Sequence, residues 1–275
     1  MTRIALFQST TGIDPAANAR SLAGAVEQAA AGGAEMLFTP EMSGLLDRDS
    51  ARAAKMLSPQ DRDRVLAAAR EAAAQHRIWL HVGSLAVLLD DGKVANRGFV
   101  IDREGQVRAT YDKLHLFDVD LPTGESWRES NIYSAGSGVT LVNGTPVGKL
   151  GLTICYDLRF PGLFARLAES DADVIAVPAA FTVPTGRAHW HVLLRARAIE
   201  AGLFVVAAAQ VGHHEDGRNT FGHSLVVDPW GEIQLDMSEG NGVGFADIDL
   251  KRISEVRSRI PALNHRRPIP DAVTL

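Results

Sequence analysis

The chain has 275 residues, of which 46% are hydrophobic, and its formal net charge is -5 at pH 7. A chain of this length and composition can bury one large core, so we expect a single domain over residues 1–275. The weakly acidic balance argues against nucleic acid or an anionic membrane as a partner, because both need clustered Lys and Arg, and it favours a small-molecule or protein partner.

One pattern recurs four times, in which a helical segment rich in Ala and Arg leads through a short turn into a β-rich run. In chain order, the predicted helices and the strands that follow them span residues 16–31 and 36–39, 61–75 and 78–82, 163–170 and 174–177, and 190–200 and 203–207. Helices that alternate with short buried strands predict an α/β layered fold. Hairpin-like segments at 99–108 and 225–233 indicate that the sheets are mixed.

The amino terminus and the apolar stretches of the chain indicate where in the cell the protein is expected. The amino terminus enters a strand-like run without the apolar segment of a signal peptide, and the longest apolar stretches, such as residues 203–209, are far shorter than the roughly 20 residues that span a bilayer. We therefore expect a cytoplasmic protein without a membrane segment. The tail, residues 257–275, is rich in Pro and Arg and lacks periodicity, so we expect it to pack on another subunit or on the domain surface.

Cys155 is the only cysteine, which excludes an intrachain disulfide, and it closes the apolar run at residues 149–154. The apolar run predicts a buried strand, and the residues from Asp157 onward predict a turn into a helix. Cys155 would then lie at the end of a strand beside a helix amino terminus, whose partial positive charge favours a thiolate. For a cysteine taken alone, an inert buried side chain is the more common interpretation.

Two other residues change that interpretation when they are taken together with Cys155. Glu41 follows a predicted strand directly, and Lys113 has apolar neighbours, although a solvated loop glutamate and a lysine with a buried stem would each be ordinary. A thiol with an unperturbed pKa near 8.5 needs a base, and Glu41 could serve. The Lys113 ammonium and the backbone N–H of Tyr156 could stabilise the oxyanion of a tetrahedral intermediate.

Three segments carry a resemblance to a known family: Phe38-Thr-Pro-Glu41, Tyr111-Asp-Lys113-Leu-His-Leu-Phe-Asp118 and Gly151-Leu-Thr-Ile-Cys155-Tyr-Asp-Leu-Arg-Phe-Pro161. In content, order and spacing they resemble the signature segments of the nitrilase superfamily of carbon-nitrogen hydrolases, and the resemblance extends over nearly the whole chain. It implies a four-layer αββα sandwich, no cofactor, and a homodimer or larger homo-oligomer in which subunits pair through helices near the active site.

The resemblance also implies a role for each matching residue. Glu41 would be the general base, Lys113 the electrophilic stabiliser and Cys155 the nucleophile. A second glutamate of the family matches Glu129 better than Glu125, and its implied role is to orient Lys113 and the substrate nitrogen. A solvated loop residue remains the alternative for Glu129.

A further stretch, residues 179–210, is similar to the amidases that act on deaminated glutathione and to the related omega-amidases. This branch implies a small linear amide that carries a carboxylate, with Arg159 and Arg187 as candidate anchors that could equally be surface salt-bridge residues. The remaining residues expected at the substrate are Tyr156, Phe181 and Thr182. His191 stands where those enzymes usually have glutamate, which puts substrate preference in doubt more than the chemistry.

The histidines give little local indication of a metal site. His189 and His191 project about 200° apart on a helix, and no metal-binding spacing such as HExxH occurs, so we expect no metal. Three alternatives remain. The chain could act on a nitrile or an N-carbamoyl substrate, it could be a cysteine-histidine hydrolase with His189 or His223 as its base, or it could be a non-catalytic interaction protein on the same fold.

Overall fold

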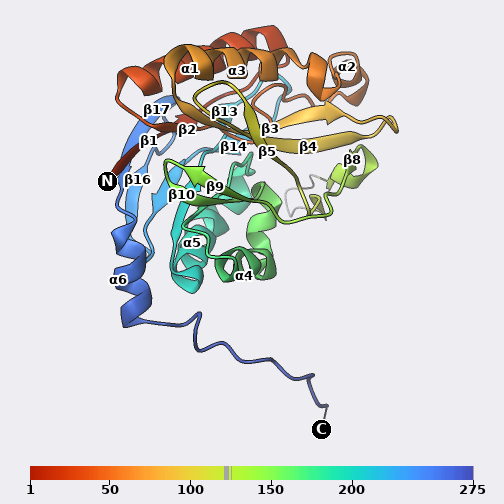
Figure 1. The fold of residues 1–275 in the computed structure, drawn as a ribbon. Helices are drawn as coiled ribbons and strands as arrows, with labels where there is room; N and C mark the ends of the chain where they lie inside the picture. The colour runs from red at the N-terminus through yellow and green to blue at the C-terminus, as the bar shows by residue number, and fades with distance from the viewer. Residues whose placement is uncertain (121–123, 125, 275) are drawn as a thin grey trace.

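Two β-sheets lie face to face between two pairs of helices in the computed structural model, which describes residues 1–120, 124 and 126–274 (Figure 1). The first sheet runs in the order β17 (Gly242–Ile248), β1 (Thr2–Gln8), β2 (Met36–Phe38), β3 (Trp79–Leu88), β4 (Val94–Ile101) and β5 (Val107–Asp112), and β8 (Tyr133–Ser134) pairs with β4. The second sheet runs in the order β16 (Ile233–Asp236), β15 (Leu225–Val227), β12 (Phe204–Ala207), β11 (Val174–Ala176), β10 (Gly148–Leu152) and β9 (Leu141–Thr145).

Both sheets are mixed, as the hairpin-like segments predict. In the first sheet β1, β2 and β3 are parallel, whereas β3, β4 and β5 are antiparallel to their neighbours. In the second sheet β10, β11 and β12 are parallel, and the outer pairs are antiparallel. Two separate hairpins are formed by β6 (Asp118–Asp120) with β7 (Ser126–Arg128), and by β13 (Val211–His213) with β14 (Asn219–Phe221).

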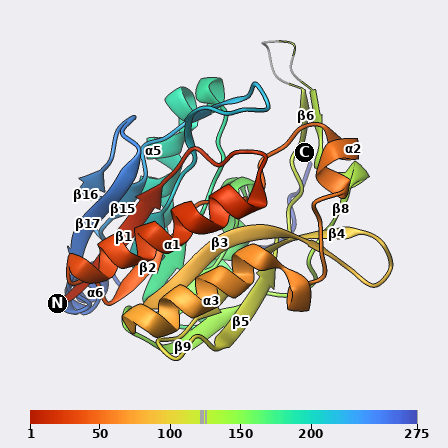
Figure 2. The ribbon, with the colours of Figure 1, turned by 90° about the horizontal axis from the view of Figure 1, so that it is seen from above.

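The helices form the outer layers. Figure 2 shows α1 (Pro15–Ala31) and α3 (Arg64–His76) side by side on the outer face of the first sheet. On the opposite side of the molecule, α4 (Pro161–Glu169) and α5 (Val183–Ala201) cover the second sheet. The remaining helical segments are α2 (Ser50–Ala54), α6 (Lys251–Arg259), η1 (Gln60–Arg62), η2 (Glu129–Asn131) and η3 (Cys155–Arg159). This four-layer αββα order confirms the predicted architecture.

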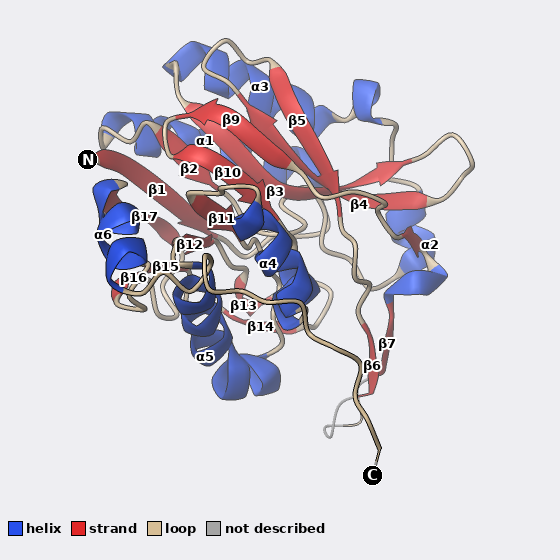
Figure 3. Cartoon of the chain, turned by 60° about the horizontal axis from the view of Figure 1, so that its bottom comes forward, coloured by secondary structure: helices blue, strands red, loops and turns tan. Residues whose placement is uncertain are grey.

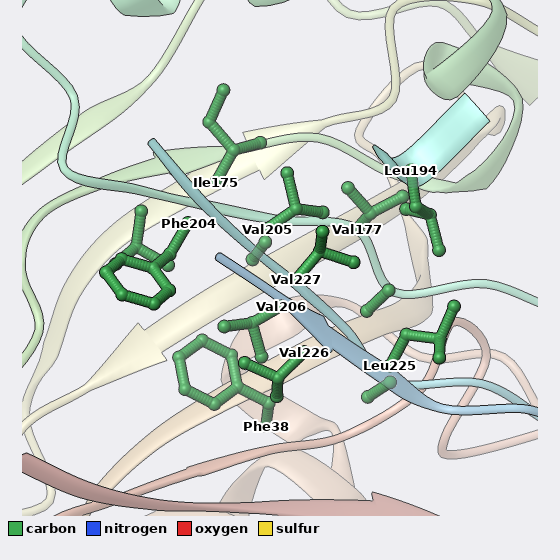
Figure 4. Close-up of a cluster of buried hydrophobic side chains, with 14 of the residues drawn as sticks. Phe38, Ile175, Val177, Leu194, Phe204, Val205, Val206, Leu225, Val226 and Val227 are labelled. Atoms are coloured by element: carbon green, nitrogen blue, oxygen red, sulfur yellow. The ribbon is translucent and has the colours of Figure 1, made fainter. Parts of the chain in front are cut away.

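Side-chain alternation along the strands divides the core into two parts. In β1, Ile4 and Leu6 join the core between the two sheets, whereas Ala5 and Phe7 pack toward α1 and α3. Figure 4 shows how Phe38 of β2 lies beside valines of the second sheet in the core between the sheets. Both faces of the inner strands are therefore buried, which explains their continuous apolar runs.

Three of the four predicted helices agree with the structure to within three residues at each end, and the fourth does not. Helix α5 begins at Val183, seven residues before the predicted start at Trp190. Pro184 occupies its first turn, where a missing N–H costs nothing, so the helix can begin before this proline.

The carboxyl-terminal tail also differs from its prediction. Its irregular part begins after α6 ends at Arg259, three residues later than expected. Figure 3 shows the tail running past α4 and away from the two sheets. Arg266 contacts α4 through Glu169, but most of the tail that the structure describes is exposed. None of the described helices has the length and apolarity needed to cross a membrane.

Candidate active site

Four residues that the sequence singles out meet in one cavity of about 610 Å³. Glu41 follows β2, Lys113 follows β5, Glu129 begins η2 and Cys155 begins η3. Each therefore comes from a segment that directly follows or lies near the end of a strand, where the sheet exposes its carboxyl edge. Glu125, the alternative second glutamate, lies outside the described residues.

Lys113 connects the two glutamates. Its Nζ donates to Glu41 Oε1 at 2.9 Å and to Glu129 Oε2 and Oε1 at 2.8 and 3.1 Å. The lysine side chain is only 2% exposed. Burial alone would lower the pKa of Lys113, but Glu129 and Glu41 outweigh burial and raise it well above 10.5. The lysine is therefore a fixed ammonium with two carboxylate partners.

Glu41 is held as a carboxylate on both of its oxygens. Oε1 accepts from Lys113 and from Nδ2 of Asn96 at 3.0 Å, and Oε2 accepts from the backbone N–H of Ala180 at 2.9 Å. Burial alone would raise the pKa of Glu41, but Lys113, a hydrogen bond from the Cys155 thiol, and Asn96 bring it below its ordinary 4.5. Glu41 can therefore accept a proton from the adjacent thiol at neutral pH.

Cys155 is a buried thiol in a left-handed backbone conformation, with φ of 48°, and its N–H donates to Pro178 O at 2.8 Å. Strand β10 ends at Leu152, so the cysteine lies on the short helical turn that follows it rather than at the strand end. The surroundings as a whole favour the thiol over the thiolate. Burial and the nearby Glu41 raise the pKa of Cys155 well above 9.0, and Lys113 opposes them only in part.

Two buried residues to which the sequence analysis assigned no role hold the cluster together. Asn96 on β4 donates from one amide nitrogen to both glutamates, to Glu41 at 3.0 Å and to Glu129 at 3.1 Å. Asp157, two residues after Cys155, accepts from the Tyr111 hydroxyl at 2.7 Å and from the backbone of His115 at 3.0 Å. Asp157 thereby ties the cysteine turn to both sides of Lys113.

A glycine allows these segments to approach one another. A side chain at Gly83 of β3 would place its Cβ 2.2 Å from Thr39 O and 2.4 Å from Pro178 Cβ. Thr39 and Pro178 belong to the segments that carry Glu41 and that bind the Cys155 backbone. Only glycine fits between them, so the position of the carboxylate relative to the thiol depends on Gly83.

Four of the five residues expected at the substrate line the cavity, and one lies outside it. Tyr156, Arg159, Phe181 and Thr182 line the cavity. The Arg159 guanidinium lies over the Tyr156 ring at 6.0 Å and over the Phe181 ring at 5.6 Å. Arg187 is exposed on α5 and is not among the residues that line this cavity. Of the two candidate carboxylate anchors, only Arg159 is therefore placed at the cavity.

The far part of the cavity carries an aromatic and cationic wall that sequence patterns did not single out. Trp127 lies between two guanidiniums, with Arg48 at 5.0 Å and Arg218 at 5.1 Å from its ring. Lys93 and Arg128 line the same cavity. Their side chains come from segments far apart in the chain, which is why no local motif shows them.

Neither histidine of the cysteine-histidine alternative lies at the thiol. The His189 ring contacts Arg159 at 3.3 Å, and the His223 ring contacts Asp236 at 2.9 Å. Neither is among the cavity-lining residues that the structure describes. The group positioned to take the thiol proton is Glu41, and this geometry counts against a histidine base.

A thiol placed against a carboxylate and an ammonium, at one end of a cavity in an αββα sandwich, is the arrangement of hydrolases that attack a polarised carbon with cysteine. The carbon-nitrogen hydrolase family matches residues 3–258. The chain belongs to this family, which confirms the resemblance to the nitrilase superfamily, and it is a hydrolase of carbon–nitrogen bonds.

Similar proteins agree in sequence and in fold. Deaminated glutathione amidase of Rattus norvegicus is 39% identical over 269 residues, covering 96% of this chain and 82% of the relative. The crystal structure of the NitFhit protein of C. elegans matches with a TM-score of 0.89 at 39% identity, over 97% of this chain and 65% of that chain. An amidase from Nesterenkonia sp. AN1 matches with a TM-score of 0.82 at 25% identity, over 97% of this chain and 94% of that one.

Proposed function

We propose that the protein is an amidase that hydrolyses a small linear amide bearing a carboxylate, through a thioester on Cys155. The main support for the proposal is the position of the Glu41 carboxylate, which accepts hydrogen bonds from both the Lys113 ammonium and the Cys155 thiol. The raised pKa of Cys155 makes such a base necessary, because the resting side chain is a thiol at neutral pH.

The proposed reaction has two halves. In the first, Cys155 sulfur attacks the amide carbon while its proton passes to Glu41, and the proton then goes to the leaving nitrogen as the C–N bond breaks. In the second, water attacks the thioester carbon, Glu41 takes the water proton, and the proton returns to sulfur as the C–S bond breaks. The products are a carboxylic acid and ammonia or an amine.

Lys113 and the backbone N–H of Tyr156 would stabilise the oxyanion in both halves. Lys113 is suited to this because its charge is fixed by Glu41 and Glu129 before the substrate binds, so little reorganisation is needed as negative charge develops. Glu129 would hold Lys113 in position and face the substrate nitrogen. By comparison with other oxyanion donors, losing one costs about 3 kcal/mol of barrier.

The relatives support an amide substrate. The rat relative is named as an amidase of deaminated glutathione, which bears carboxylates. In the Nesterenkonia amidase, a mutant shows covalent addition of the acetamide moiety of fluoroacetamide at the active-site cysteine. A carboxylate-bearing amide also suits the cavity, because Arg159, Arg48 and Arg218 line it.

A substrate panel tests this proposal. The panel contains deaminated glutathione, succinamate, an uncharged amide of equal length, a nitrile and an N-carbamoyl amino acid, and released ammonia or amine is measured. We expect the highest kcat/KM for an amide that carries a carboxylate. A preference for the nitrile or the N-carbamoyl compound, or equal rates for charged and uncharged amides, would overturn it.

Two matched arginine variants test the anchor. Arg159→Gln should raise KM for the carboxylate-bearing amide by about 10- to 100-fold, the effect of losing a charge-assisted hydrogen bond, and should leave KM for the uncharged amide nearly unchanged. Arg187→Gln is the control and should change neither value, because Arg187 lies outside the cavity. Equal effects of the two variants would show that Arg159 is not the anchor.

We also propose a cytoplasmic homodimer. Large apolar side chains are exposed on and beside α5: Ile199 and Trp230 line one shallow cavity, and Val192 is exposed earlier on the same helix. Such a surface favours association through the helical face. Analytical ultracentrifugation should show a dimer that Ile199→Glu dissociates, and a wild-type monomer at micromolar concentration would contradict the dimer.

A further inference from the structure

Two histidines and an aspartate from distant parts of the chain converge outside the cavity. His191 lies on α5, His223 lies between β14 and β15, and Asp236 ends β16. Each offers one ligand atom, and these atoms all lie within 4.8 Å of one another. From this juxtaposition we infer that the His191, His223 and Asp236 side chains form a binding site for a divalent transition-metal ion of the zinc class.

The distances within the cluster are compatible with one ion. A single oxygen, Asp236 Oδ2, lies 3.0 Å from His191 Nε2 and 3.2 Å from His223 Nδ1, and the three ligand atoms all lie within 4.8 Å of one another. Two ligands that are each about 2.1 Å from a tetrahedral ion lie about 3.4 Å apart, so the aspartate would open from each histidine by only a few tenths of an ångström, and the two rings would adjust to the same spacing. Imidazole nitrogens with one carboxylate oxygen are a donor set for zinc or cobalt rather than for calcium or magnesium.

The backbone holds His223 in an uncommon conformation that directs it to this cluster. Its φ is 55°, in the left-handed region, and its N–H donates to Ser238 O at 2.7 Å while its carbonyl accepts from Trp190 Nε1 at 2.8 Å. Strain of this kind persists only where the surroundings fix it, and it often marks a functional position. Trp190, which directly precedes His191 on α5, thus holds the backbone of His223 in position.

Further contacts orient the three side chains. The His223 ring stacks on Phe221 at 4.5 Å with an interplanar angle of 24°, and the edge of the His191 ring meets it at 5.0 Å. Asp236 Oδ1 also accepts from the backbone N–H of Ser238 at 2.8 Å. Metal sites generally have such supporting contacts, which set ligand orientation before the ion arrives.

The placement indicates a structural role. An ion at this site would join the middle of α5 to β16, the edge strand of the second sheet, and three protein ligands would leave one position for water. His191 adjoins Trp190, whose ring contacts Phe181 of the cavity wall at 4.8 Å. The ion would therefore stiffen the wall of the cavity without touching Cys155. The inference does not depend on the proposed amidase activity.

The experiment measures metal binding without an activity assay. It uses the full-length Cys155→Ala protein, because a thiol would compete for zinc, and it titrates Zn²⁺ by calorimetry and Co²⁺ by visible absorption. We expect one ion per chain, with the d–d bands of four-coordinate cobalt. At a zinc concentration about 100-fold above Kd, the unfolding midpoint should rise by roughly 5 °C or more.

Variants in the same background locate the site. His191→Ala, His223→Ala and Asp236→Asn should each weaken zinc binding by at least about 100-fold, since even supporting residues of metal sites contribute 10- to 100-fold. His213→Ala is the matched control, because His213 is exposed and bonded to Asn219 outside the cluster, and it should bind as the parent does.

Three results would overturn the inference. They are the absence of binding by the Cys155→Ala protein, binding that survives all three ligand variants, and binding that His213→Ala weakens equally. A circular dichroism spectrum identical to that of the parent shows that a variant is folded. With any of these three results, the cluster is a hydrogen-bonded His–Asp–His group only. Should an alanine variant fail to fold, Asp236→Asn and the cobalt spectrum still decide the question.

Discussion

Replacing Asn96 with leucine removes the donor that links the two glutamates while keeping the branched shape of the side chain. Asn96 is fully buried, and its Nδ2 donates to Glu41 and to Glu129, so one substitution affects both carboxylates. The Oδ1 atom of Asn96 has no hydrogen-bond partner among the described residues, so the change also removes one unsatisfied buried acceptor. The fold should therefore tolerate leucine better than the site does.

The size of the effect follows from the hydrogen bonds lost. A hydrogen bond to a charged group contributes about 1.5 to 3 kcal/mol, and 1.4 kcal/mol corresponds to about one pKa unit or a tenfold change in rate. The bond from Asn96 lowers the pKa of Glu41, so its loss raises that pKa. We expect the acid limb of kcat/KM to move upward by about 1 to 2 pH units. Glu41 stays mostly ionised at pH 7 after such a shift, so the fall of kcat/KM expected there, about 10-fold, comes from the lost positioning of the two carboxylates.

The assay is the pH dependence of kcat/KM on the best amide of the substrate panel. Asn219→Leu is the matched control, because Asn219 lines the same cavity but is exposed and hydrogen-bonded to His213, away from both glutamates. It should leave the acid limb in place. An Asn96→Leu enzyme with a wild-type acid limb and a kcat/KM within twofold of wild type would refute the reasoning.

Three further predictions concern stability and the identity of the base. Asp157→Asn should lower the free energy of unfolding by about 3 to 5 kcal/mol in chemical denaturation, because the buried carboxylate binds Tyr111, Ile154 and His115, and a loss below about 1 kcal/mol would contradict its linking role. Gly83→Ala should cost about 3 kcal/mol or more, whereas Gly24→Ala in α1, where a Cβ meets nothing within 4 Å, should be neutral or stabilising, so equal effects would be contrary to expectation. Because the pKa of Glu41 lies below 4.5, kcat/KM should stay level from pH 7 to 5 and fall only on further acidification, and a limb near pH 6.5 would instead identify a histidine base.

Most of the fold could be predicted from the sequence, because the helical and strand periodicities were clear and matched the layers of the structure. The boundary of α5 was wrong because Pro184 is compatible both with a loop and with the first turn of a helix. Cys155 lies on a helical turn and not at the end of a strand as predicted, and local sequence preferences could not show this. A left-handed turn at a non-glycine residue is unfavourable locally, and tertiary contacts such as the bond to Pro178 O stabilise it here.

At the site, the residues with local motifs were predictable and those that act through tertiary contacts were not. Glu41, Lys113 and Cys155 stood out by type and position, and the structure brings them together. Asn96 lies in the middle of a strand with nothing in its neighbours to indicate a role. The convergence of His223 and Asp236 on His191 could not be predicted, because these residues lie 13 to 45 positions apart in the chain and no short motif connects them.

The central claim is that Cys155 is the nucleophile. The most direct measurement is the kcat/KM of purified Cys155→Ala protein beside wild type on the best amide substrate, with circular dichroism to show that both are folded. If Cys155 is the nucleophile, kcat/KM should fall by at least about 10⁴-fold, in the range found when the nucleophile of a covalent hydrolase is removed. Turnover by Cys155→Ala within tenfold of wild type would contradict it.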